Sequence, residues 1–78
     1  MVSPGQAIAF IGINYLSISL LVADRVTKTA AVELLGFDTS GDIEIVMRIR
    51  GATAMIQVAA ETARSAAQEY GAAASISQ

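Results

Sequence analysis

The spacing of hydrophobic and polar residues changes along the chain, and each change predicts a new element. Residues 7–14 form a short apolar run, which is typical of a buried strand. Residues 17–30 follow a helical period instead, and Ser17 stands where an N-cap residue is expected. Residues that recur at spacings of three and four should form the inner face of this helix: Leu20, Ala23, Thr27 and Ala30.

The second half of the chain repeats this succession. Residues 32–37 and 43–49 are predicted to be strands, and the second alternates apolar with mostly polar positions. The alanine-rich segment 52–70 predicts a long helix that ends at Gly71, and residues 72–76 can form a short last strand. Three residues of this helix are expected in the core: Met55, Ile56 and Val58.

The predicted order is strand, helix, strand, strand, helix, strand. Two split βαβ halves of this kind form a ferredoxin-like α+β sandwich, in which both helices cover one face of an antiparallel sheet. The 78 residues are expected to make a single domain, 1–78. Hydrophobic residues are 54% of the chain and charged residues only 15%, so part of the apolar surface is expected to face another copy.

Composition and charge argue against several classes of function. The net charge is −2 without a basic block, which disfavours nucleic-acid binding. The chain has no histidine and no cysteine, so we expect no metal site, no cofactor and no catalytic residues. The apolar stretches are too short to cross a bilayer and the N-terminus does not look like a signal peptide, so no membrane association and a cytoplasmic location are expected.

The segment Gly36–Ile45 places a polar hairpin, Asp38–Asp42, between two strands. Asp, Thr, Ser and Gly are the residues that turns favour, so an ordinary turn explains this composition. Two carboxylates and two hydroxyls are nevertheless more polar groups than a turn requires. The residues alone leave both interpretations open.

Several segments taken together resemble a known family. The segments 22–28 (VADRVTK) and 30–37 (AAVELLGF), with Ala7-Ile8 before them and Arg50-Gly51 after them, keep the spacing of the shell-protein domain of bacterial microcompartments. That resemblance implies the same βαββαβ fold and no enzymatic activity. It also implies flat homo-hexamers that pack edge to edge with other shell proteins into a shell in the cytoplasm, which can enclose enzymes.

The resemblance also implies roles for particular residues. The loop between the second and third strands lines a pore on the hexamer axis in this family, which assigns Thr39, Ser40, Gly41 and Asp42 to the pore. The family's loop usually reads lysine-isoleucine-glycine-serine-glycine, so Asp42 replaces a neutral residue. A ring of carboxylates would favour cations or neutral polar metabolites over anions.

Lys28 corresponds to a lysine at the hexamer edge in the family, with Asp24 one helical turn before it. The simpler interpretation is a solvated i, i+4 ion pair that contributes a few tenths of a kcal/mol. For the whole chain, the alternative to a shell protein is a small dimeric or trimeric ligand-binding or regulatory domain, since one fold hosts many functions.

Overall fold

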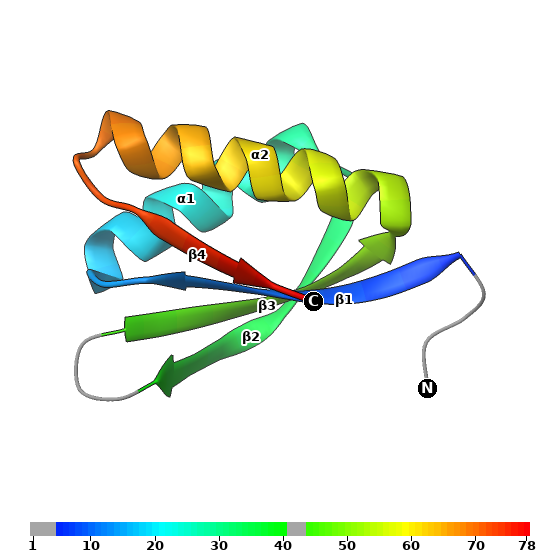
Figure 1. Cartoon of the computed structure of the whole chain (residues 1–78), viewed down its shortest axis with the longest axis horizontal. Helices are drawn as coiled ribbons and strands as arrows, with labels where there is room; N and C mark the ends of the chain where they lie inside the picture. Colours follow the sequence, from blue (N-terminus) through cyan, green and yellow to red (C-terminus); the bar gives the residue numbers. More distant parts are fainter. Residues whose placement is uncertain (1–4, 41–43) are drawn as a thin grey trace.

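The computed structural model describes residues 5–40 and 44–78, and its elements follow the predicted order. The four strands form one antiparallel sheet in the order β2-β3-β1-β4, and both helices cover one face of it (Figure 1). This confirms the ferredoxin-like α+β sandwich. The elements are β1 (Gln6–Ile13), α1 (Leu16–Thr29), β2 (Val32–Ser40), β3 (Glu44–Ala52), α2 (Thr53–Glu69) and β4 (Ala74–Ser77).

The core lies between the sheet and the two helices. Successive side chains of a strand point to opposite faces, so alternate residues of the two central strands turn toward the helices. In this layer the fully buried large side chains are Ile11, Ile13, Met47 and Ile49 from the sheet, and Val22, Val26 and Ile56 from the helices. The alternation predicted for β3 is therefore confirmed, while its other face, with Arg48 and Arg50, is more exposed.

Helix α1 differs from its prediction at the start and in its inner face. It begins at Leu16 with Tyr15 as N-cap, and no side chain caps it, so the expected cap at Ser17 is wrong. Its buried residues are Ser19, Val22, Ala23 and Val26. Leu20, expected inside, is 51% exposed. Large apolar residues lie on more than one side of this helix, so the period alone does not decide which side packs on the sheet.

Helix α2 packs through small side chains. Four of its alanines are fully buried: Ala59, Ala63, Ala66 and Ala67. Without longer side chains between them, the backbone of α2 can come close to α1 and to the sheet. Ile56 is in the core as predicted, whereas Val58 is exposed. Gly71 has a φ of +74° just after the helix, which confirms its predicted role as the C′ residue.

Strand β2 is longer than the hydrophobic pattern predicted. Its register shifts between Leu34 and Gly36, and Gly36 has a φ of +150°, which favours glycine. Beyond this irregularity the strand continues to Ser40, through residues that the sequence placed in a turn. None of the helices within the described ranges is both long and apolar enough to span a membrane.

Candidate functional site

The hairpin between β2 and β3 is the first candidate site. Thr39 pairs with Ile45 and Ser40 with Glu44, so both residues end β2 rather than forming a wide polar loop. Gly41 and Asp42, also predicted to line a pore, lie outside the described residues. The end of β2 and the start of β3 lie at the end of the sheet where β1 leads into α1 and α2 ends (Figure 1). The structure thus places Thr39, which is exposed, at one end of the subunit.

Asp38 belongs to the strand and not to the turn. It lies opposite Val46 in the β2–β3 ladder, and its Oδ2 is 2.9 Å from Nε of Arg48. Arg50 forms a similar pair with Glu33 on the same two strands. Arg48 and Arg50 therefore both form ion pairs with carboxylates of the same chain. The Asp38 charge is directed to Arg48 on the outer face of the sheet.

Two of the segments that carried the family resemblance are neighbours across β2 and β3. Glu33 lies opposite Arg50, and Val32 lies opposite Gly51. A Cβ at Gly51 would be 3.0 Å from Val32 Cγ1 and 3.2 Å from the carbonyl oxygen of Ala31, so a larger residue would push these neighbours away and glycine favours the close approach of the strands. The sequence spacing between Val32-Glu33 and Arg50-Gly51 thus reflects the pairing of β2 with β3.

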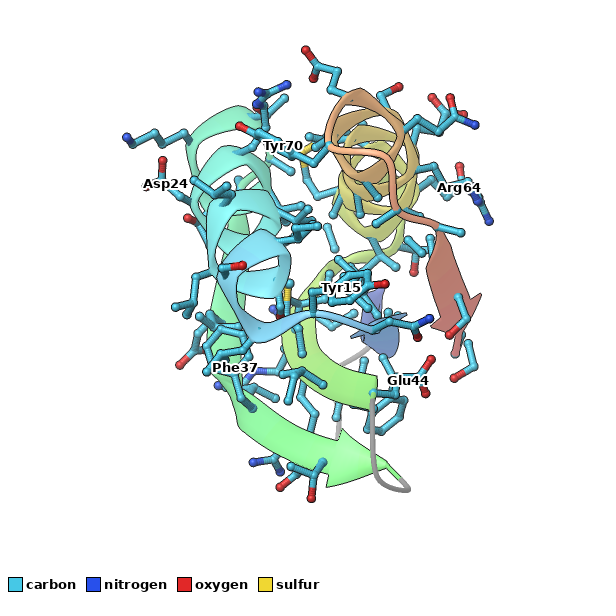
Figure 2. All side chains as sticks on the ribbon, turned by 90° about the vertical axis from the view of Figure 1, so that its left-hand side faces the viewer. Tyr15, Asp24, Phe37, Glu44, Arg64 and Tyr70 are labelled. Carbon is cyan, nitrogen blue, oxygen red and sulfur yellow. The ribbon has the colours of Figure 1, made fainter. Side chains whose placement is uncertain are left out.

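Asp24 and Lys28 are paired on the exposed side of α1. Lys28 Nζ donates a hydrogen bond to Asp24 Oδ2 at 3.0 Å, which confirms the predicted i, i+4 pair. The two side chains are 62% and 74% exposed, so the pair itself contributes little to stability. Figure 2 shows Asp24 on the outer side of α1, far from Glu44 at the start of β3. The two predicted sites are therefore separate surfaces of the molecule.

The N-terminal half of α1 and its N-cap residue carry exposed large apolar residues that the hydrophobic pattern did not predict. Leu16, Leu20 and Leu21 are 57%, 51% and 47% exposed, and the N-cap residue Tyr15 is 60% exposed. Three leucines exposed within six residues of one helix exceed the scattered apolar exposure of an ordinary surface, and such patches mark interaction sites. The clustering of these residues in the sequence is a signal of such a surface, whereas the helical period assigned Leu20 to the inner face.

Among the described residues, the titratable groups form separate pairs and do not gather at one place. Arg25 pairs with Glu69 between α1 and α2, and this hydrogen bond and the carboxylate charge raise the pKa of Arg25 above its ordinary value. Arg25 therefore stays charged at any working pH. Within residues 5–40 and 44–78, no three metal-ligating side chains come together.

Comparisons with known proteins agree with this architecture. The model of the BMC domain family matches residues 7–78, which is nearly the whole chain. A crystal structure of a microcompartments protein from Desulfitobacterium hafniense DCB superposes with a TM-score of 0.76 at 20% sequence identity. The match covers 92% of this chain and 40% of that protein, so the chain spans less than half of its length. No curated protein matches this chain.

Proposed function

The chain belongs to the BMC domain family of bacterial microcompartment shell proteins, and we propose that it is a structural tile of such a shell. Six copies form a ring, and rings pack edge to edge into a sheet. The observation that carries this proposal is the family match over residues 7–78 on a chain with the same βαββαβ fold. The match also favours a shell protein over the alternative, a small regulatory domain.

The surface of α1 supports association with other copies. An isolated subunit would expose the apolar residues Leu16, Leu20 and Leu21 to water. Closed rings form when one patch on a subunit meets a different patch on the next, and apolar area buried there stabilises the ring. The low content of charged residues, 15%, fits a subunit with much of its surface in contacts.

The hairpin end of the sheet is the proposed pore lining. In the ring, Thr39, Ser40, Gly41 and Asp42 of all six copies surround the axis, and small polar metabolites pass between them. A sixfold set of Asp42 carboxylates favours cations and neutral solutes. Asp38 does not add to this charge, because its carboxylate is paired with Arg48.

The exposed pair on α1 is the proposed edge between tiles. Lys28, hydrogen-bonded to Asp24, projects from the outer side of the helix and meets its counterpart in the adjacent ring. The proposed partners are thus copies of this chain and other shell proteins, in a shell in the bacterial cytoplasm that encloses enzymes. The tile itself catalyses no reaction.

Electron microscopy of concentrated protein tests the edge and the tile together. The proposal predicts ordered sheets, tubes or stacked discs for the unaltered chain. Lys28→Ala should keep the ring intact in size-exclusion chromatography but abolish the ordered sheets, because the ring does not use this edge. Arg64→Ala, which removes an exposed cation from α2, is the matched control and should still form sheets. If Lys28→Ala still forms ordered sheets, Lys28 does not hold the edges of adjacent rings together.

A further inference from the structure

A pocket on the outer face of the sheet has no part in the proposed tile. It has a volume of about 220 Å³ and lies over β1, β3 and β4, on the face that the helices leave free. Its lining includes Phe10 and Gly12 from β1, Glu44 and Val46 from β3, and Ser75 and Ser77 from β4. Figure 2 shows Glu44 on this side of the sheet, away from both helices.

The missing side chain at Gly12 makes room for the Glu44 carboxylate in the wall of the pocket. Gly12 lies between Val46 and Ser75 in the sheet. A Cβ at Gly12 would be 2.6 Å from both Cδ and Oε2 of Glu44, and 2.8 Å from Oγ of Ser75. The Glu44 carboxylate therefore lies directly over the glycine. There its Oε2 accepts a hydrogen bond of 3.1 Å from the Ser75 hydroxyl, which orients the group.

Glu44 has no positively charged partner within the described part of the chain. The four ion pairs found there join Arg25, Lys28, Arg48 and Arg50 to other carboxylates. Arg48 lies directly opposite Phe10 in the sheet, but its guanidinium turns to Asp38 on the far side of β3. The β1–β4 side of the outer face thus presents one oriented carboxylate whose charge no described side chain neutralises.

The remaining walls determine which kind of cation fits. The Phe10 ring is 38% exposed, and an aromatic face attracts cations and packs against short carbon chains. The serine hydroxyls can donate hydrogen bonds to a ligand or accept them from it.

The number of charged groups and the volume limit which cation fits. One carboxylate is too few for Ca²⁺, which takes six to eight oxygen ligands. Since water occupies about 30 Å³ per molecule, the pocket holds a molecule of roughly five to seven non-hydrogen atoms.

We infer that this pocket binds a small organic cation, a primary ammonium on a short carbon chain. The ammonium donates hydrogen bonds to Glu44, and the carbon chain packs against Phe10 and Val46. Glu44 pairs with Ser40 at the hairpin end of the sheet, so the site lies beside the proposed pore lining. Binding to one subunit does not require the ring, so the inference goes beyond the proposed function.

Two-dimensional ¹H–¹⁵N NMR of the whole chain, at constant ionic strength, tests this site with three probes of similar size. The probes are propylammonium, neutral 1-propanol and anionic propionate. Propylammonium should shift the amide signals of Gly12, Ser75 and Ser77 in a saturable way, and the other two should not. No saturable shift with propylammonium, or equal shifts with 1-propanol, would overturn the inference.

Variants identify the groups responsible. Glu44→Gln keeps the shape but removes the charge, and should weaken propylammonium binding about tenfold or more, because hydrogen bonds to charged groups are the stronger ones. Gly12→Ala should also weaken binding, because its Cβ displaces the carboxylate. Glu61→Gln, which removes an exposed carboxylate on α2, should bind as the unaltered chain does. Unchanged binding by Glu44→Gln would contradict the assignment.

Size-exclusion chromatography of the same samples separates this inference from the proposed function. If the ring is intact but binds no propylammonium, the inferred binding site is wrong and the proposed shell function stands. If the chain binds propylammonium but forms no ring, the proposed shell function is wrong and the binding site stands.

Discussion

Ser19 shows how one residue can lower the stability of a helix that otherwise packs well. It is fully buried on α1, and its hydroxyl has no hydrogen-bond partner among the described residues. A buried hydroxyl without a partner destabilises the folded state, because it loses its hydrogen bonds to water and gains none in the protein. Serine is also a weaker helix former than alanine.

Ser19→Ala should therefore raise the free energy of unfolding by about 1 kcal/mol, which for a domain of this size raises the melting temperature by roughly 4–8 °C. Thermal unfolding at fixed protein concentration measures the change. Ser17→Ala, at an exposed position on the same helix, is the control and should have a smaller effect. A melting temperature that falls in Ser19→Ala would mean that the hydroxyl has a partner in the assembled protein.

Gly36 is the second single residue on which the fold depends. Its φ of +150° is unfavourable for any residue with a side chain, and a Cβ there would be 3.0 Å from Nη2 of Arg48. Gly36→Ala should destabilise the protein by about 1–3 kcal/mol, through backbone strain and displacement of Arg48. Urea unfolding at fixed protein concentration checks this. An unchanged midpoint would show that β2 adopts another register without cost.

At the scale of elements, the contact between α2 and its neighbours limits the size of side chains. Ala63 is fully buried on α2, and Ser65 is exposed on the same helix. Ala63→Leu should destabilise the chain by about 1–3 kcal/mol, because a well-packed interior has no room for the added carbons. Ser65→Leu, in the same denaturation experiment, should change stability little. Equal effects of the two substitutions would contradict close packing of α2.

The elements also show how much of the structure the sequence could predict. Apolar runs, the alternation along β3, the helical period of α1 and the alanine content of α2 together identified all six elements in order. The inner face of α1 was misassigned, since Leu20 and Leu21 are as apolar as the valines that pack on the sheet. Strand β2 was cut short because Asp38 and Thr39 are typical turn residues, and only their partners on β3 make them a strand.

The candidate sites were less predictable than the fold. The Asp24–Lys28 pair follows from helical spacing alone, and the structure contains it. The pocket at Gly12 could not be predicted, because it joins β1, β3 and β4, which are distant in sequence. The pore role that we propose for Thr39, Ser40, Gly41 and Asp42 depends on an axis shared by several copies, which no pattern within one chain encodes.

At the scale of the whole assembly, the charge of the hairpin should control which solutes pass. Asp42→Lys should reverse the preference of assembled shells from cations to anions, because six positive charges would replace six negative ones around the axis. The entry rates of a cationic and an anionic dye of equal size measure this preference. Glu61→Lys, with the same charge change on α2, is the control. Unchanged entry of anions through Asp42→Lys shells would show that Asp42 does not face the pore.

The central claim is that six copies of this chain form a closed ring. Native mass spectrometry of the purified chain at micromolar concentration measures the number of copies directly. The account predicts a dominant species of about six times the chain mass of 8.1 kDa. A discrete complex of two or three chains would contradict it.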